Sequence, residues 1–365
     1  MSHKVVFLST LSPFNIKNWS GTLLHISSAL SNQNAIEWIG QDILKALNKY
    51  SFRKTPYPET YAKLFGKILS ERINRCSYDV IIVRDYFLGA YLEVKVPIIY
   101  IGDTTFRLFK ENMRILSAEF EKTADSVEER MIVNADCIIF SSDWAKESAV
   151  KDYKCFESKI HIVEFGANIP SPLEYQINIR TEICNLVFIG KEWKRKGADK
   201  VIGAYRQLKQ CGFKCQLTII GSTPEQKLES DDNLTIIPHL DKSKKEDLDR
   251  LDGILKNSHF LILPTNFEPF GIVFCEASAY GVPSIAADVG GVSQPIKEGK
   301  NGFLLPPDAT AEDYAEKIKS VFCDKKKYIE LRKSSRQEYE TRLNWDVWGE
   351  KVNKILEETV ENYNR

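Results

Sequence analysis

Short apolar runs alternate with longer stretches of helical periodicity along the first part of the chain. The runs lack the polar alternation of a half-exposed strand, as in Val-Ile-Ile-Val at 80–83. Between them lie helical patterns such as 21–30, where Leu23, Ile26 and Leu30 share one face. Buried strands that alternate with helices predict a parallel sheet covered on both faces. The expected strands are 5–8, 80–83, 97–101, 137–140 and 160–163, and the longer helices are 60–75 and 109–134.

The pattern pauses near residues 166–183, where Pro170 and Pro172 stand in a stretch without helical or strand period. Such a stretch is typical of an interdomain linker. The alternation then starts again, so the sequence predicts two α/β domains whose ligands bind in a cleft at the carboxyl ends of the strands. The second series of strands is 185–189, 216–220, 234–237, 260–263, 283–287 and 303–305, with helices at 199–210, 242–256, 311–322, 325–341 and 345–362.

Composition narrows the class of protein. The chain of 365 residues is 43% hydrophobic and 27% charged, which excludes a largely disordered or fibrous protein. Its 50 basic and 50 acidic side chains cancel, so the basic excess that nucleic-acid binding usually needs is missing.

Location is inferred from cysteines and apolar runs. The eight cysteines are scattered, which favours reduced thiols and a cytoplasmic protein. The longest apolar runs fall far short of the roughly 20 residues that cross a bilayer. Attachment to the inner face of a membrane stays open, because Lys45, Lys49, Arg53, Lys54, Lys63 and Lys67 could form a lipid-facing patch, although a solvated surface is the simpler interpretation.

The segment 267–277 carries the strongest candidate chemistry. A buried strand ends just before it, and a helix opens near Gly271. The exposed amides of Gly271, Ile272 and Val273 would form an anion site suited to a diphosphate. Glu268 stands before this helix and Glu276 inside it. An ordinary strand–loop–helix unit with a solvent-side Glu268 is the alternative.

The two glutamates, with seven residues between them, resemble the E-x7-E signature of retaining glycosyltransferases of family four (glycosyl transferases group 1). The blocks 279–284, 288–296 and 298–304 match the same signature. The resemblance implies the GT-B fold, in which two Rossmann-like domains face each other across a cleft. It also implies that Glu268 contacts the donor sugar and that Glu276 binds the nucleotide ribose.

A cationic segment precedes Gly197 and contains Lys191, Lys194, Arg195 and Lys196. It follows a predicted strand, so its charges could stabilise a leaving diphosphate. A solvated charge run is the alternative. The resemblance places Lys196 in the diphosphate clamp. The family usually has Arg where this chain has Lys191, so either Lys191 or Arg195 completes the clamp.

Three further residues follow predicted strands. Gly21 lies in the loop after the first strand and could approach a phosphate or sugar, although Ser20 could simply cap the following helix. Asp103 occupies a place where many members of the family carry histidine; it could orient the donor sugar or cap a helix. His239 follows a strand of the second domain, and the resemblance implies that this stretch meets the nucleotide base.

Other candidates are weaker. Asp247 and Asp249 form a D-x-D pattern, but the leucine stripe of 242–256 turns them toward solvent, which argues against a metal site there. The resemblance likewise implies an enzyme without a catalytic metal. No G-x-G-x-x-G follows the first strand, which argues against a nicotinamide enzyme.

We therefore predict a retaining glycosyltransferase that transfers a sugar from a UDP- or GDP-sugar to a glycan or lipid-linked acceptor, without a separate cofactor. A nucleotide-sugar epimerase or hydrolase, and a non-catalytic nucleotide-sugar-binding scaffold, remain alternatives. The expected domains are 1–168 on the acceptor side, a linker at 169–184, a nucleotide-sugar domain at 185–344 and a final helix at 345–365 that packs back on the first domain.

Overall fold

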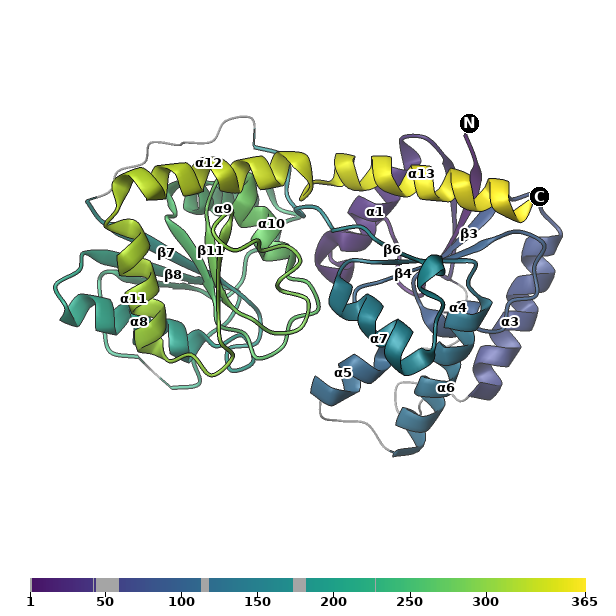
Figure 1. Cartoon of the computed structure of the whole chain (residues 1–365), viewed down its shortest axis with the longest axis horizontal. Coiled ribbons are helices and arrows are strands. Elements are labelled where there is room, and N and C mark those ends of the chain that lie inside the picture. Colours follow the sequence, from purple (N-terminus) through teal and green to yellow (C-terminus); the bar gives the residue numbers. More distant parts are fainter. Residues whose placement is uncertain (1, 42, 44–58, 113–117, 173–181, 227) are drawn as a thin grey trace. The chain divides into compact units, whose positions relative to one another are not determined.

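A computed structural model describes residues 2–41, 43, 59–112, 118–172, 182–226 and 228–365. The chain divides into two compact units (Figure 1). Unit 1 comprises Met1–Glu164 and Trp345–Arg365, and unit 2 comprises Phe165–Asn344. Part of the predicted linker, 173–181, lies outside the described residues, as do Lys45, Lys49, Arg53 and Lys54.

Unit 1 is built on a six-stranded parallel sheet with the order β2-β1-β3-β4-β5-β6. Three of its inner strands, β3, β4 and β5, are buried along their whole length, which explains their uninterrupted apolar runs. Sequence reasoning missed β2, an edge strand whose exposure alternates. The strands are β1 (Lys4–Leu8), β2 (Ala35–Ile39), β3 (Val80–Val83), β4 (Ile98–Gly102), β5 (Cys137–Phe140) and β6 (Ile160–Ile162).

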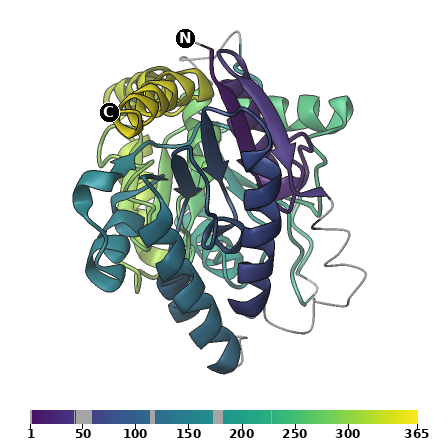
Figure 2. The same ribbon diagram turned by 90° about the vertical axis from the view of Figure 1, so that its right-hand side faces the viewer.

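Helices cover both faces of this sheet (Figures 1 and 2). On one face, α13 packs on α1: the rings of His25 and Trp345 stack 5.6 Å apart, and Asn34 Nδ2 donates to Asn353 Oδ1 at 2.7 Å. The final helix therefore belongs to unit 1. The helices are α1 (Thr22–Ser31), α3 (Glu59–Asn74), α4 (Tyr86–Gly89), α5 (Phe106–Asn112), α6 (Ala118–Asn134), α7 (Asp143–Tyr153) and α13 (Trp345–Tyr363), with short 3-10 turns at Asn18–Gly21 and Glu157–Lys159.

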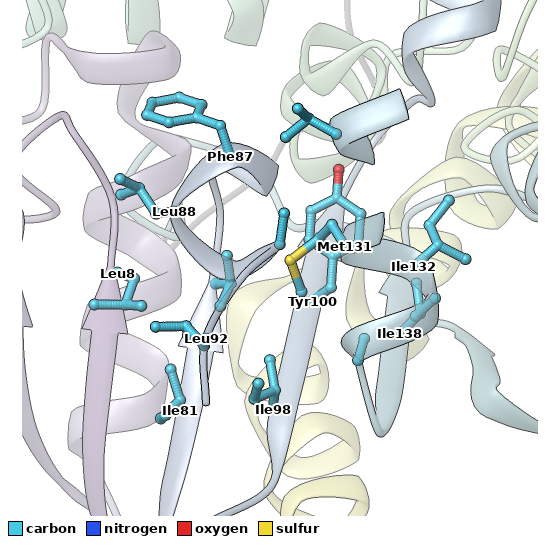
Figure 3. Packing of buried hydrophobic residues seen from close by; sticks show 14 of the residues in the cluster. Leu8, Ile81, Phe87, Leu88, Leu92, Ile98, Tyr100, Met131, Ile132 and Ile138 are labelled. Carbon is cyan, nitrogen blue, oxygen red and sulfur yellow. The ribbon is translucent and has the colours of Figure 1, made fainter. Parts of the chain in front are cut away.

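One hydrophobic core of unit 1 lies between the sheet and the helices α3, α4, α6 and α7. Figure 3 shows Met131 of α6 beside Tyr100 of β4, with Ile98 of the same strand further along the core. Gly89 permits this packing, because a Cβ there would overlap the Met131 sulfur. The predicted helix 109–134 corresponds to α5 and α6, with residues 113–117 outside the described residues.

Unit 2 contains a second six-stranded parallel sheet, with the order β12-β11-β10-β7-β8-β9. The chain leaves β7 toward β8 and β9, and then returns to the other side of β7 with β10. This is the doubly wound Rossmann order, and its direction reverses between β7 and β10. The strands are β7 (Cys184–Ile189), β8 (Cys215–Ile220), β9 (Leu234–Ile237), β10 (Phe260–Leu263), β11 (Ser284–Ala287) and β12 (Gly302–Leu305).

Two layers of helices enclose this sheet (Figure 1). The helices α8 and α11 pack together, as do α10 and α12. Buried Arg332 of α12 donates to the Tyr280 carbonyl oxygen at 3.1 Å, directly after α10. The helices are α8 (Ala198–Gln210), α9 (Lys245–Asn257), α10 (Ile272–Ala279), α11 (Ala311–Phe322) and α12 (Lys325–Thr341). The helix predicted at 242–256 begins only at Lys245. In the described parts of both units, no helix is long and apolar enough to span a bilayer.

Candidate functional site

The candidate site of unit 2 lies where the chain direction reverses in the sheet. The loop after β7 covers residues 190–197, and the loop after β10 covers 264–271. Both loops leave the carboxyl ends of neighbouring strands. Ligands of open α/β sheets bind at this position, because the loops diverge there and the next helices begin.

Backbone contacts join the two loops. Asn266 N donates to the Arg195 carbonyl oxygen at 2.9 Å, and Arg195 Nη1 donates to the Phe267 carbonyl oxygen at 2.8 Å. Gly197 has a φ of +76°, and a Cβ there would overlap the Pro264 carbonyl oxygen. The glycine therefore serves two needs at once, a left-handed backbone and a close approach between the loops.

This junction brings Lys196 and Glu268 together. The lysine Nζ forms an ion pair with Glu268 Oε2, and the side chains are only 12% and 11% exposed. A carboxylate this deeply buried needs a charge partner or hydrogen bonds to stay ionised at low cost. The predicted pair of a sugar-orienting carboxylate and a phosphate-binding cation therefore occupies one place in the fold.

Glycines after β11 hold the backbone of Glu268. Gly291 N donates to the Glu268 carbonyl oxygen at 3.0 Å. The neighbouring Gly290 has a φ of +58°, and a Cβ there would overlap the same oxygen. The position of Glu268 is thus fixed from β7 through its side chain and from β11 through its main chain.

Helix α10 points its amino end at the same region. Gly271, with a φ of +92°, is the N-cap residue and makes no side-chain capping hydrogen bond. The amides of Ile272 and Val273 belong to the first turn, where the helix dipole is positive. Together with Lys196, this end of the helix suits a phosphate group.

One turn further along α10 lies Glu276, whose side chain is 3% exposed. Its Oε1 accepts a hydrogen bond from Lys242 Nζ, which comes from the loop between β9 and α9. Lys242 is the first residue of the helix predicted at 242–256, and it is not among the predicted site residues. The available signal was its position shortly after a strand that ends at the same edge of the sheet.

The remaining cations of the loop after β7 have different surroundings. Lys194 Nζ pairs with Glu225 at 2.7 Å on the surface. Arg195 donates hydrogen bonds from Nε and Nη2 to the two carboxylate oxygens of Glu192, and these hydrogen bonds lower the pKa of Glu192. Among the described residues, Lys191 has no ion-pair partner. It is exposed and is therefore the more available of the two alternatives for the diphosphate clamp.

The ends of β8 and β9 border this region. Gly190 and Gly221 meet closely, since a Cβ on Gly221 would lie 3.0 Å from the Gly190 carbonyl oxygen. Ser222 follows and is buried, and its hydroxyl has no hydrogen-bond partner among the described residues. His239 follows β9 and is exposed. Sequence reasoning did not single out Ser222.

Gly21 and Asp103, the predicted acceptor-side residues, belong to unit 1. Gly21, with a φ of +96°, is the N-cap of α1. The N-cap position is thus occupied by Gly21 and not by Ser20, which has a φ of +56° and continues a left-handed turn begun at Trp19. Arg84 directly follows β3, and its guanidinium lies 4.0 Å from the centre of the Trp19 ring. Asp103 directly follows β4.

A buried carboxylate supports the loop that contains Asp103. Glu128 of α6 accepts hydrogen bonds from Phe106 N, from Tyr153 OH at 2.7 Å and from Tyr100 OH at 3.1 Å. Burial raises the pKa of Glu128 to about 7, although the three hydrogen bonds oppose this shift. Glu128 thereby fixes the start of α5.

Asp247 of the D-x-D pattern stabilises the loop before α9. Asp247 Oδ2 accepts a hydrogen bond from Asp241 N at 2.9 Å, next to the start of α9. Throughout the described ranges, no group of three His, Cys, Asp or Glu side chains is arranged to hold a metal ion.

Sequence comparison connects unit 2 to a known family. Residues 176–338 match the family model described as Glycosyl transferases group 1. The chain is 26% identical over 176 residues to a glycogen synthase of Mycobacterium tuberculosis, which covers 46% of this chain and 41% of that protein. It is 21% identical over 253 residues to a D-inositol 3-phosphate glycosyltransferase of Rhodococcus opacus, covering 65% and 56%. The chain thus spans about half the length of these curated relatives.

Structural comparison extends over both units. A glycosyltransferase from Rickettsia africae aligns over 99% of both chains with a TM-score of 0.70 and 17% identity. The Anabaena protein Alr3699/HepE, solved in complex with UDP-glucose, aligns over 98% of this chain and 100% of its own with a TM-score of 0.65 and 16% identity. These likenesses confirm the predicted two-domain α/β GT-B fold, and the family match confirms the predicted resemblance.

Proposed function

Because unit 2 carries a glycosyl transferases group 1 domain, we propose that this chain is a retaining glycosyltransferase that uses a nucleotide-sugar donor. The observation that carries the proposal is the convergence of Lys196, Glu268 and the uncapped amino end of α10. This arrangement offers a cation and helix amides to a diphosphate, and a fixed carboxylate to a sugar hydroxyl.

In this proposal, Lys196 and Lys191 balance the charge that develops on the leaving diphosphate, together with the amides of residues 271–273. Glu268 accepts a hydrogen bond from the donor sugar, and Glu276 accepts one from the ribose. A leaving phosphate oxygen takes the acceptor proton, so transfer needs no separate general base and no divalent cation.

The acceptor is proposed to be a glycan or a lipid-linked glycan bound by unit 1, near Gly21 and Asp103. The donor is proposed to be a UDP- or GDP-sugar. The solved complexes of Alr3699/HepE with UDP and with UDP-glucose make UDP-glucose the first donor to test. Association with a membrane surface remains part of the proposal for a lipid-linked acceptor.

A thermal-shift screen of UDP-, GDP- and ADP-sugars tests donor binding, because a ligand that binds only the folded state raises its stability. Transfer is then followed with candidate acceptors, and NMR of the product gives the anomeric configuration. Retention is expected. A product with inverted configuration contradicts the retaining mechanism, isomerised or freed sugar without acceptor indicates an epimerase or hydrolase, and binding without turnover indicates a scaffold.

Two matched variants test the site itself. Lys196→Met should lower the turnover number about a hundredfold, the usual cost of removing one group that stabilises transition-state charge. Lys194→Met is the control, because Lys194 pairs with Glu225 on the surface two residues away. Glu268→Gln should also slow transfer strongly. Undiminished transfer in the Glu268 variant would contradict its role in orienting the sugar.

A further inference from the structure

Lys242 adds a cation to the candidate site from the loop that follows the edge strand β9. It lies between β9 and α9, while Glu276 belongs to the helix after β10. Its Nζ contacts Glu276 Oε1 and lies 3.4 Å from the Asn168 carbonyl oxygen. The Lys242 side chain is 24% exposed, so part of it is accessible to a ligand.

Glu276 depends on this lysine. Its side chain is 3% exposed, and within the described residues Lys242 is its only side-chain partner. One carboxylate oxygen, Oε2, therefore keeps its capacity to accept a hydrogen bond. The ammonium has three N–H donors, of which the carboxylate uses one and the Asn168 carbonyl oxygen, at a long distance, a second.

Glu276 Oε2 can accept a hydrogen bond, and the remaining N–H of the Lys242 ammonium can donate one. Two adjacent hydroxyls of a sugar match this pair of groups, because each hydroxyl can donate one hydrogen bond and accept another. Glu276 lies four residues after Ile272, or about 6 Å along the helix axis from the first residue of α10, beyond which the phosphate is proposed to bind. The sugar directly attached to a bound diphosphate can reach this distance.

We propose that Lys242 is a second ribose-recognition residue, whose ammonium donates to a ribose hydroxyl oxygen while Glu276 accepts from the hydroxyls. This inference rests on the proposed function, since it needs a nucleotide bound at α10. Under this proposal, Lys242 and Glu276 together discriminate ribonucleotides from deoxyribonucleotides, and each of the two side chains contributes to the affinity for the ribonucleotide.

The test is calorimetric titration of the intact chain with UDP, GDP and ADP, followed by the 2′-deoxy and 3′-deoxy forms of the tightest ligand. The wild type should prefer the ribonucleotide over at least one deoxy form by about tenfold or more, because a hydrogen bond to a charged group contributes this much. Lys242→Met should reduce that ratio about tenfold, and Lys242→Arg should retain most of it.

Two controls keep the result interpretable. Lys244→Met removes an exposed lysine from the same loop and should leave the ratio unchanged. The double variant Lys242→Met with Glu276→Gln removes both charges, so no unpaired buried carboxylate is left to destabilise the fold. Its thermal unfolding should resemble that of the wild type, while its ratio between ribo- and deoxyribonucleotide falls toward one.

The outcomes separate the two proposals. If the wild type binds a nucleotide and Lys242→Met keeps the wild-type ratio, Lys242 only neutralises Glu276, and the inference is wrong while the proposed function stands. The inference is equally wrong if the wild type binds ribo- and deoxy forms with the same affinity. If no nucleoside diphosphate binds the wild type, the proposed function fails and the inference fails with it.

Discussion

Glu128→Gln should remove a pH dependence of stability that is built into unit 1. In the folded chain the pKa of Glu128 is about 7, against an ordinary value of 4.5. A raised pKa means that the folded state holds the proton more tightly than the unfolded state. The stabilising contribution is therefore complete below about pH 4.5 and is lost as the pH rises through about 7.

The size of the effect follows from the two pKa values. Linkage gives a loss of about 2 to 3 kcal/mol in the free energy of unfolding between about pH 5 and about pH 8. Glutamine has no proton to lose and can replace the protonated acid: its oxygen can accept from Phe106 N and Tyr153 OH, and its amide can donate to the Tyr100 oxygen. The variant should therefore lack this loss and be the more stable protein at the higher pH.

Tryptophan fluorescence during urea unfolding measures the effect in the right unit. Five of the six tryptophans belong to unit 1, and a Trp193→Phe background removes the one in unit 2. Glu129→Gln, which changes an exposed neighbour on α6, is the control and should follow the wild type. Parallel pH profiles for the wild type and the Glu128 variant would refute the reasoning.

Three further outcomes are expected. Gly290→Ala should weaken nucleotide binding, measured by calorimetry, because a methyl group overlaps the Glu268 carbonyl oxygen; Gly299→Ala, with a φ of +71° but no described atom within 4 Å of its added Cβ, should not. Lys191→Met should lower nucleoside diphosphate affinity about tenfold and leave nucleoside affinity unchanged, as expected for one lost charge contact. Arg195→Lys should mainly lower the melting temperature, because its guanidinium bridges two loops; a larger loss of affinity than of stability would assign the diphosphate clamp to Arg195 instead.

Much of the fold could be predicted because most strands of both sheets are buried. A strand that is covered on both faces has apolar residues at every position. The sequence therefore predicts β3, β5 and β10. The edge strand β2 was missed for the opposite reason: Glu37 interrupts its apolar run, and its burial alternates. Strand order was not accessible, since it depends on which runs pair across the sheet.

The candidate site was predictable only where it is continuous in sequence. Glu268, Gly271 and Glu276 stand in one segment, so spacing alone brings them to the start of one helix. The cations that neutralise the carboxylates come from other strand ends. Lys196 lies 72 residues before Glu268, and Lys242 lies 34 residues before Glu276. No local spacing rule connects such pairs.

Physical reasoning nevertheless narrows the search for such partners. A nearly buried glutamate needs a cation or several hydrogen bonds, and in a parallel sheet the candidate cations are the lysines and arginines in the loops at the carboxyl ends of the strands. For Glu276 this requirement is met by Lys242, from the loop after β9. Lys242, the first residue of the helix predicted at 242–256, thus balances the charge of Glu276, and its side chain, 24% exposed, stays partly accessible to a ligand.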